Sequence, residues 1–583
     1  MISTALLIVA PAVVVVVWLV AIASPGTWFA RVIREPEDRM LLAAGSVASA
    51  LWFAAWLVIK VVPASHAAQA VTAVSAAAFL SAFAVAGCAC LHVSSRRDWV
   101  AYWRTAIPVG LLLLAAFLVT TGLGLLWSGP GTIVELQAYR YLDMPTDHLI
   151  PIFFADGLRG GGVPSPLLDG WYSADRPPLQ TGFLLLFTNV LEAGLGLPRQ
   201  NTDAYISIVC QTLFVVAAFR FGRCVTQSRA VGAVCAVAVI LVPATGIYMF
   251  FTWPKLLAAA YVLTAFSLTL DLLRSRARPA RGLRWIGGCF GLAAALALLS
   301  HGASIFTIVP VLVVFAAACI RRTESRPQRA MLMLVGGIAA AVTYLPWLAY
   351  GKLTGEDHGR LIKWHLAGNP AGSLTPTLTD IWTAYGNLTL ADIVAAKRAN
   401  VETLFHAPST PTTLSDLIAL LQDAPSWRFA EFNCLLLISG IAVVWLVPLG
   451  ALILSPRRRR LRPLLQTTWL TLAVAVASLT LWCLLMFTGG ATIPHQGSII
   501  LIFLPTLLCA LLVSALSLRI GIVVLIVQAA AFAYLMIPPN RVRFDAIPAD
   551  YAPSPVALLL LALGIACGLA GLVAATVADR KGR

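Results

Sequence analysis

The feature that most constrains this chain is a series of long apolar segments that follow one another along nearly the whole sequence. Most contain about 17–25 residues, the length that crosses a hydrocarbon core of roughly 30 Å as an α-helix. Helices are the economical form for such segments, because lipid offers no partner for unpaired backbone N–H and C=O groups. The sequence therefore predicts an all-α, polytopic transmembrane helical bundle.

The composition agrees with this class: 60% of the residues are hydrophobic and 11% are charged, where a soluble domain carries about 25% charge. About sixteen helices are expected, with ends uncertain by a few residues. They cover residues 4–23, 40–63, 67–92, 105–127, 179–197, 203–219, 230–250, 255–273, 285–300, 302–320, 330–350, 431–454, 464–488, 498–516, 519–537 and 554–577.

Two long connections divide the chain into five expected regions. These are N-terminal helices (1–127), a first outer loop (128–178), core helices (179–350), a second outer loop (351–430) and C-terminal helices (431–583).

The formal net charge of +16 predicts topology and not a nucleic-acid partner, because most of the excess lies in short loops. Short loops rich in Lys and Arg stay on the cytoplasmic side. These loops are 31–39, 94–104, 274–284, 321–329, 455–462 and 578–583. Both long loops then fall on the non-cytoplasmic face. One conflict remains: either 179–197 or 203–219 does not span, or 220–229 lies outside against the charge rule.

The first outer loop places ionisable residues beside apolar ones. The stretch "TDHLIPIFFADGLRGG" (146–161) is typical of an amphipathic surface helix that Thr146 or Asp147 could cap. The apolar side chains of 149–154 would face the membrane surface. Asp147 is a candidate catalytic carboxylate, and the alternative is that it only caps the helix.

The next stretch, "SADRPPLQ" (173–180), leads back into the membrane, and its two prolines fix the backbone there. Asp175 and Arg176 beside them could form an ion pair with each other. Alternatively, Arg176 could bind an anionic head group, since guanidinium groups match phosphate oxygens well.

Further cationic side chains occur in the predicted outer connections. Lys255 follows Trp253 at the start of a helix, where it could bind phosphate or could reach toward water as an interfacial lysine. His301 occupies a tight break between two helices, where it is a candidate ligand or a cap. His495 and Gln496 follow a Gly-Gly break.

The second outer loop contains "RLIKWHLA" (360–367). If this stretch is helical, Arg360, Lys363 and Trp364 share one face, since their spacings are three and four residues. That face could bind a phosphate beside the membrane, together with His365. The alternative is an interfacial amphipathic helix without a ligand.

The order of these elements resembles the GT-C superfamily of polytopic glycosyltransferases, which includes protein O-mannosyltransferases and the aminoarabinose transferases of lipid A. The family's first outer loop carries an Asp-acid pair and then a run such as Glu-Lys-Pro-Pro-Leu. This chain offers Asp147-His148 and the run 175–179, Asp-Arg-Pro-Pro-Leu. It departs from the pattern in having His148 for the second acid and about three helices before the loop. The resemblance covers about residues 105–350.

The resemblance implies an enzyme that transfers a sugar from a polyprenyl-phosphate donor to a glycan, lipid or protein acceptor at the outer face of a bacterial plasma membrane. It implies Asp147 as general base, with His148 able to share the work. No cofactor is expected, and His148 weakens the case for a divalent metal. The expected groups for the donor phosphate and lipid are Arg176, Lys255, His301, Arg360, Lys363, His365 and His495. Secondary positions are Asp175, Trp253, Trp364 and Gln496.

Two other functions fit a polytopic chain. A polymerase or ligase of lipid-linked glycans would use many helices and outer-loop cations, but would be expected to lack the Asp-helix-Pro-Pro order. A transporter or flippase should place charges in mid-membrane and show paired repeats with broken helices. Here the predicted helix centres are nearly free of charge, and no repeat is visible.

Overall fold

The structure, a computed structural model, is helical throughout the part of the chain it describes. The described residues are 2–25, 27–91, 96–127, 132–142, 144–168, 170–274, 280–323, 325–357, 359–368, 377–405, 413–433, 442–454, 462–487, 504–538 and 553–581. The helices of the N-terminal half are α1 (Ile2–Ile22), α2 (Trp28–Val32), α3 (Pro36–Val61), α4 (Ala64–Leu91), α5 (Arg96–Leu125), α6 (Ile133–Tyr139), η1 (Thr146–Leu149), α7 (Ile150–Arg159), η2 (Ser173–Asp175), α8 (Leu179–Leu195), α9 (Arg199–Thr226), α10 (Arg229–Ile240), α11 (Pro243–Phe251), α12 (Lys255–Arg274) and α13 (Ala280–Ser300). Those of the C-terminal half are η3 (Gly302–Ser304), α14 (Ile305–Arg322), α15 (Arg326–Thr354), α16 (Arg360–Ala367), α17 (Thr377–Gly386), α18 (Leu390–Phe405), α19 (Leu414–Gln422), α20 (Ala424–Asn433), α22 (Val443–Ile453), α23 (Arg462–Leu485), α24 (Leu504–Leu516), α25 (Leu518–Met536) and α27 (Pro555–Arg580).

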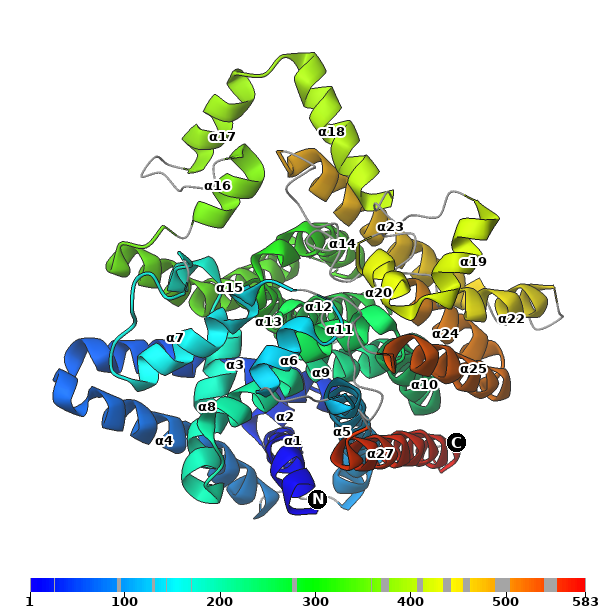
Figure 1. The fold of residues 1–583 in the computed structure, drawn as a ribbon, viewed down its shortest axis with the longest axis horizontal. Helices are drawn as coiled ribbons and strands as arrows, with labels where there is room; N and C mark the ends of the chain where they lie inside the picture. Colours follow the sequence, from blue (N-terminus) through cyan, green and yellow to red (C-terminus); the bar gives the residue numbers. More distant parts are fainter. Residues whose placement is uncertain are drawn as a thin grey trace.

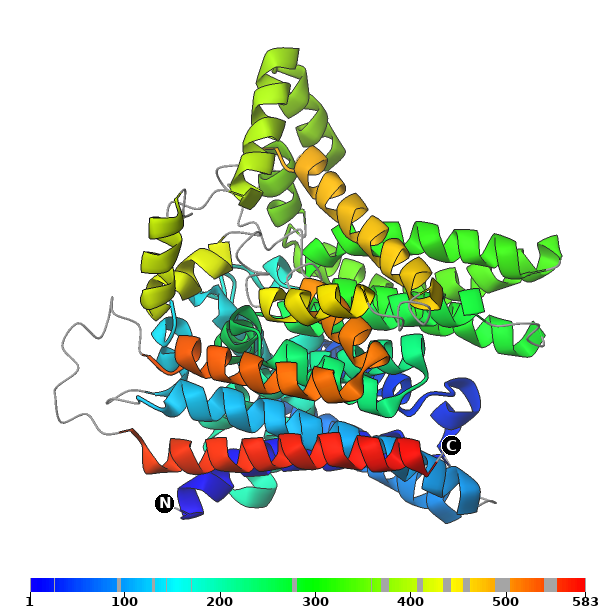
Figure 2. The same cartoon turned by 90° about the vertical axis from the view of Figure 1, so that its right-hand side faces the viewer.

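The all-α, polytopic architecture expected from the sequence is confirmed. Within the described ranges, 11 helices are long and apolar enough to cross a membrane, or 12 if the bent pair α10–α11 counts as one span. Helices α16, α17 and α18 of the second long loop project together beyond the rest of the molecule (Figure 1), and Figure 2 shows the same from the side.

One end of the bundle gathers loops that the charge rule predicts to be cytoplasmic. Arg220 of α9 is bound to Asp38 at the start of α3, at 3.1 Å, and also to Asp271 near the end of α12. The carboxylate of Asp579, near the C-terminus, accepts a hydrogen bond from the backbone N–H of Arg229 at 2.9 Å. We call this the basic end, formed by residues 35–39, 220–229, 271–274 and 579–581.

The opposite end carries both long loops, and we call it the loop end. Arg360 of the second loop binds Asp175 of the first, with Nε 2.9 Å from Oδ1. The start of α27 lies here as well, since the Ser554 N–H donates to the Leu126 carbonyl at 3.0 Å. Helix α27 therefore runs from the loop end to the basic end, where the C-terminus lies (Figure 2). The expectation that both long loops share one face agrees with this placement.

The position of α8 resolves the conflict in the predicted topology. Gln180, at its start, accepts a hydrogen bond from Gln211 of α9 at 3.1 Å, while Thr188 donates to Asp203 of α9 at 2.7 Å. Helix α8 therefore runs antiparallel to the first half of α9 only and does not reach the basic end. It has 17 residues and is not among the candidate spans. Residues 220–229 lie with the other basic loops, as the charge rule requires.

The helix expected over 230–250 is wrong, because the chain breaks after α10 and α11 is inclined to it by 73°. Pro243 is the first residue of α11, and Val242 before it is extended (φ −98°, ψ 126°). Proline lacks an N–H and disfavours the helical conformation of the residue before it, so the break follows from this pair.

The helix expected over 431–454 also differs from the structure. Helix α20 begins earlier, at Ala424, and ends at Asn433, while α22 begins at Val443; residues 434–441 lie outside the described part of the chain.

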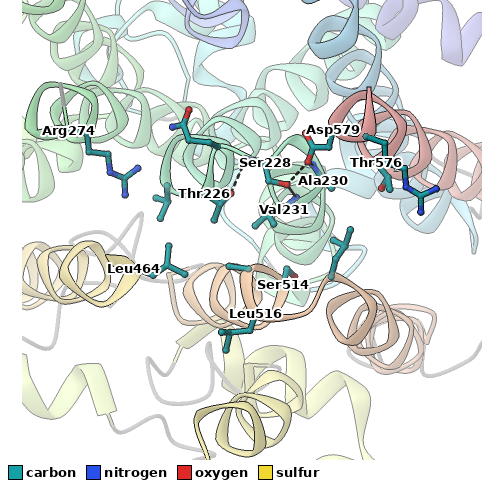
Figure 3. A pocket seen from close by; sticks show the side chains of 15 residues that line it. Thr226, Ser228, Ala230, Val231, Arg274, Leu464, Ser514, Leu516, Thr576 and Asp579 are labelled. Carbon is teal, nitrogen blue, oxygen red and sulfur yellow. Dashed lines mark hydrogen bonds between the residues drawn. The ribbon is translucent and has the colours of Figure 1, made fainter. Parts of the chain in front are cut away.

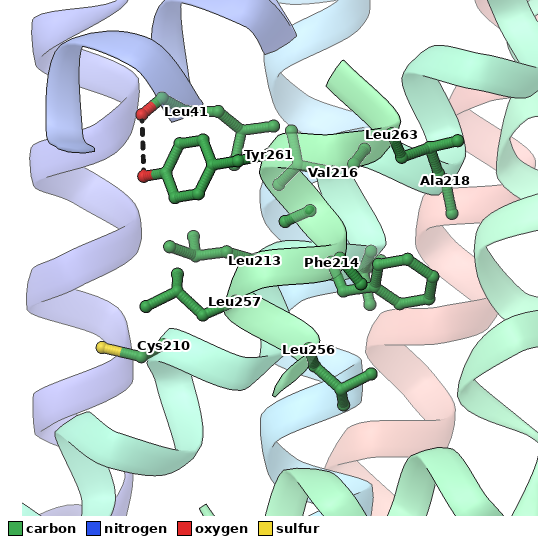
Figure 4. Packing of buried hydrophobic residues seen from close by; sticks show 14 of the residues in the cluster. Leu41, Cys210, Leu213, Phe214, Val216, Ala218, Leu256, Leu257, Tyr261 and Leu263 are labelled. Carbon is green, nitrogen blue, oxygen red and sulfur yellow. Dashed lines mark hydrogen bonds between the residues drawn. The ribbon is translucent and has the colours of Figure 1, made fainter. Parts of the chain in front are cut away.

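The core of the bundle lies where α3, α9 and α12 pack against one another. Leu213, Phe214 and Leu257 are buried there, and the Tyr261 hydroxyl donates to the Leu41 carbonyl at 3.1 Å (Figure 4). The most apolar stretch of α9 is wholly buried inside the protein. Because α12 begins at Lys255, this packing fixes Lys255 at the loop end of the core.

Glu431 of α20 predicts a pH-dependent stability. Its buried carboxyl group accepts hydrogen bonds from Trp427 Nε1 at 2.7 Å and from the Ala244 N–H at 3.4 Å. Burial nevertheless raises the pKa of Glu431 to about 8. The folded protein then holds this proton more tightly than the unfolded chain does, so stability should fall as pH rises from about 5 to 8, by at most about 1.4 kcal/mol per pH unit.

Glu431→Gln should remove this dependence, because the amide cannot ionise. Thermal denaturation in detergent should show a variant that is more stable than the wild type at pH 8 and similar to it at pH 5. Equal slopes with pH for the two proteins would contradict the assignment.

Candidate active site at the loop end

Asp147 lies in η1, a short 3₁₀ turn that Pro145 precedes, and its residue surface is 4% exposed. It does not cap a helix, because no side-chain capping hydrogen bond forms at η1 or α7. Instead, its Oδ2 accepts a hydrogen bond from Arg176 Nη2, and its Oδ1 has no hydrogen-bond partner among the described residues. The cap alternative is therefore wrong, and a buried carboxylate with one unused oxygen remains.

The apolar face of α7 does not lie on the membrane surface as expected. Ile150, Ile152 and Phe154 are buried, and α7 packs against α3, α4 and α8, while Phe153 alone of that stretch is 38% exposed. An amphipathic pattern shows that one face is covered but not whether lipid or protein covers it. This packing holds η1, and with it Asp147, against the bundle.

Arg176 is buried and pairs with Asp147 across 29 positions of sequence. Its guanidinium carbon lies 5.2 Å from the ring centroid of Trp171 and 5.9 Å from that of Trp253, and its Nε has no hydrogen-bond partner. The ion pair expected between the neighbours Asp175 and Arg176 does not form, since Asp175 binds Arg360 instead.

Lys255 is the first residue of α12 and only 2% exposed, so it does not reach toward water at an interface. Its Nζ lies 3.5 Å from the ring centroid of Trp253 and 5.7 Å from that of Tyr248. Within the part of the chain that the structure describes, Nζ has no hydrogen-bond partner. The amine is close enough to Arg176 and Asp147 to interact with both electrostatically.

Two histidines border this cationic group. His301 caps η3, where its Nδ1 accepts a hydrogen bond from the Ala303 N–H at 3.2 Å. Burial, and then the charges of Lys255 and Arg176, hold the pKa of His301 well below its usual value. Burial and the same two charges lower the pKa of His365 in α16 to about 4. Both imidazoles are therefore neutral at pH 7.

His148 is oriented by the backbone. Its Nδ1 lies 3.3 Å from the Pro145 carbonyl oxygen, so Nδ1 carries the hydrogen and Nε2 is an acceptor. The ring lies against Phe251, with centroids 4.6 Å apart, and Nε2 is buried without a partner. Burial lowers the pKa of His148 to about 4. It is therefore a neutral neighbour of Asp147 and not a second acid.

Some of the other predicted residues lie away from this cationic group, and two lie outside the described ranges. The expected helix forms as α16, but its cationic face is taken up by acids: Arg360 binds Asp175, and Lys363 binds Asp357 at 2.8 Å. Trp364 stacks on His365, with centroids 5.5 Å apart. His495 and Gln496 lie outside the described residues.

The structure thus brings five of the predicted residues into one cluster at the loop end. This site cluster consists of Asp147, Arg176, Lys255, His301 and His365, with His148 and Trp253 beside it.

Trp171 and Tyr248 border the site cluster but were not predicted. Each is an aromatic side chain a few residues before a predicted cation, Arg176 or Lys255, and that spacing was the available signal. Glu356 was also missed: its carboxylate accepts hydrogen bonds from Ser173 Oγ and from the Ala174 N–H at 2.9 Å.

Asp147 supplies the one carboxylate of the site cluster, and that carboxylate is bound to Arg176. Among the described residues, no group of three or more His, Cys, Asp or Glu side chains could hold a metal ion.

Residues of the two long loops form a partly buried clasp, consisting of the pairs Arg360–Asp175 and Glu356–Ser173. The Asp175 side chain is almost fully buried, so Arg360→Met should leave an uncompensated carboxylate and destabilise the protein by about 3–5 kcal/mol. Asp175→Asn added to that variant should recover part of the loss. Thermal denaturation midpoints of the single and double variants measure this.

The matched control is the exposed pair Arg398–Glu402, whose loss should cost about 0–1 kcal/mol. Equal effects of Arg360→Met and Arg398→Met would contradict the clasp.

Fold and site together define a polytopic helical membrane protein with a buried carboxylate beside buried cationic and imidazole groups. No family model matches the chain, and no curated protein matches it. Among solved structures, it is similar to ArnT from Cupriavidus metallidurans bound to undecaprenyl phosphate, at 14% identity and a TM-score of 0.32 over 73% of this chain and 79% of that one.

Proposed function

We propose that this protein is a GT-C-type membrane glycosyltransferase that moves a sugar from a polyprenyl-phosphate donor to a cell-envelope acceptor. The observation that carries the proposal is the pairing of the buried Asp147 carboxylate with Arg176, next to the Lys255 amine that lacks a hydrogen-bond acceptor. The first-loop motif, Asp147-His148 followed by 175–179, supports the same class by resemblance.

The cationic part of the site cluster suits a phosphate. Arg176 and Lys255 offer N–H groups in a region shielded from water, where charge-assisted hydrogen bonds are strong. Trp253 and Trp171 form an apolar wall beside them, suited to the first isoprene units of a lipid. Ionisable groups buried in a membrane protein are costly, and they commonly mark a ligand site or a pathway.

Asp147 is the proposed general base. In the transfer, the acceptor hydroxyl loses its proton to Asp147 while its oxygen bonds to the anomeric carbon, and the sugar–phosphate bond breaks. The negative charge of the leaving phosphate is then held by Arg176 and Lys255. A base must lie within hydrogen-bond reach of the hydroxyl, and Oδ1 is the oxygen available for it.

Arg176 links donor binding to this step. While it binds Asp147, its guanidinium group occupies the Oδ2 oxygen of the carboxylate. A donor phosphate that binds the Arg176 guanidinium would displace Asp147 from it. Asp147 could then bind the acceptor hydroxyl. His148, neutral and with Nε2 as acceptor, is placed to hold the acceptor hydroxyl or share its proton.

The charge rule predicts the loop end to face the outside of a bacterial plasma membrane, so the acceptor would be a glycan, lipid or protein there. The test is a transfer assay with the purified protein and a panel of polyprenyl-phosphate sugars, with nucleotide sugars as the comparison. Transfer from a polyprenyl-phosphate sugar is expected. Transfer from nucleotide sugars alone, or no binding of any polyprenyl phosphate, would refute the proposal.

A further inference from the structure

A cavity lies at the basic end, at the far end of α9 and α12 from the site cluster. It has a volume of about 680 Å³ and lies between the ends of α9, α12, α24 and α27 and the starts of α10 and α25 (Figure 3). Ligand pockets commonly measure about 300–1,000 Å³, so this cavity is large enough for a head group and part of an acyl chain. None of the described residues proposed for sugar transfer lines it.

The lining is half apolar and half cationic or polar. Val231, Leu464 and Leu516 form apolar wall, while Arg274 lies across the cavity from Thr576 (Figure 3). Arg274 is exposed and donates to the carbonyl of Cys224 and to Thr467 Oγ1, so it is held in place at the rim.

Arg580 is the second cation of the lining and is also exposed. Among the described residues it makes no hydrogen bond or ion pair, and its guanidinium group is available to a ligand. The neighbouring acid, Asp579, does not oppose an anion strongly, because its carboxylate is held by the N–H groups of Arg229 and Ala230 at 2.9 and 3.1 Å.

Two further features of the lining point to an anion. Ser514 is 3% exposed and lines the cavity, and no described residue forms a hydrogen bond with its hydroxyl. Helix α25 begins at Leu518, which lines the cavity too, so the start of this 19-residue helix lies beside it. The Ser517 hydroxyl accepts from one of its first N–H groups, that of Ile520 at 3.5 Å, and the dipole at the helix start still favours negative charge.

We propose that this cavity binds the phosphate-bearing head group of an anionic phospholipid, from the leaflet at the basic end. Arg274 and Arg580 would bind the phosphate from the rim, and the apolar wall would take the acyl chain. The positive-inside rule also places the basic end at the cytoplasmic leaflet. That leaflet contains anionic lipids, and basic pockets between helices bind their head groups. The proposal is independent of the sugar-transfer proposal.

The test is native mass spectrometry of the full-length protein, released from nanodiscs of phosphatidylglycerol or of phosphatidylcholine. The wild type should retain one bound phosphatidylglycerol molecule, and it should retain phosphatidylcholine less well. The double variant Arg274→Gln, Arg580→Gln should weaken that retention by about tenfold or more, since two charge-assisted contacts are lost. Ser514→Ala, which changes neither charge nor fold, should weaken it less. Arg321→Gln, an exposed arginine of α14 that does not line the cavity, should leave it unchanged.

A titration with inorganic phosphate in detergent distinguishes a free anion from a lipid. Saturable binding of phosphate that is lost in the double variant, without retention of phosphatidylglycerol, would overturn the lipid proposal in favour of a soluble anion. Equal retention of the two lipids, or the same loss in Arg321→Gln as in the double variant, would overturn it altogether.

Discussion

Asp147→Asn should lower the rate of sugar transfer by about 10²–10⁴-fold, the usual contribution of a positioned general base. The amide keeps the size of the side chain and an oxygen for Arg176, but it cannot take the proton of the acceptor hydroxyl. The affinity for the donor should not fall, because Arg176 no longer has a competing carboxylate. The measurement is single-turnover transfer together with binding of the polyprenyl-phosphate sugar.

The matched control is Asp156→Asn, which changes an acid of the same loop that binds Arg159 and is not part of the site cluster. It should retain activity. Full activity of Asp147→Asn in a folded, inserted protein would remove the general-base role. A parallel loss of donor binding would instead assign Asp147 to holding the site together.

The sequence was most informative about spans and ends. Apolar length located most of the helices, and clusters of arginine identified the end at which Arg220, Arg274 and Asp579 meet. Both signals are local, because burial in lipid and the charge of a short loop depend on a few neighbouring residues. The break before Pro243 was also encoded locally, since a proline in a predicted helix interior is a breaking signal.

The pairing of charges could not be predicted in the same way. Asp175 has an arginine next to it in sequence, yet it binds Arg360, 185 positions later, and Arg176 binds Asp147. Such choices depend on which surfaces the helices bring together, which no local pattern specifies. For the same reason, the prediction that Lys363 binds the donor phosphate did not anticipate its ion pair with Asp357.

The path of α8 shows a further limit of local reasoning. Its 17 residues are mostly apolar, and this length and composition fit a span as well as a helix covered by protein. Only the contacts of Gln180 and Thr188 with α9 distinguish the two. A polar side chain in an apolar helix can thus indicate a protein neighbour, but not which one.

Lys255→Met should have opposite effects on stability and on donor binding. Without a donor, the Lys255 amine is buried with no hydrogen-bond acceptor, a costly arrangement that the face of Trp253 offsets by only about 0.5–2 kcal/mol. Methionine of similar length should therefore leave the donor-free protein equally stable or more stable. When a donor is bound, its phosphate supplies the missing acceptor. Loss of the amine in Lys255→Met should therefore weaken donor binding by about 100-fold, or about 2.7 kcal/mol.

Thermal denaturation with and without a polyprenyl phosphate measures both effects in one experiment. The wild type should gain stability on adding the lipid, and Lys255→Met should gain little. Lys352→Met, an exposed lysine near the end of α15, should behave as the wild type does. A donor-free Lys255→Met protein that is much less stable would show that the amine serves the fold. Because a structural lysine and a phosphate-binding lysine predict opposite signs for the same substitution, this measurement separates a site that awaits an anion from one that is complete without it.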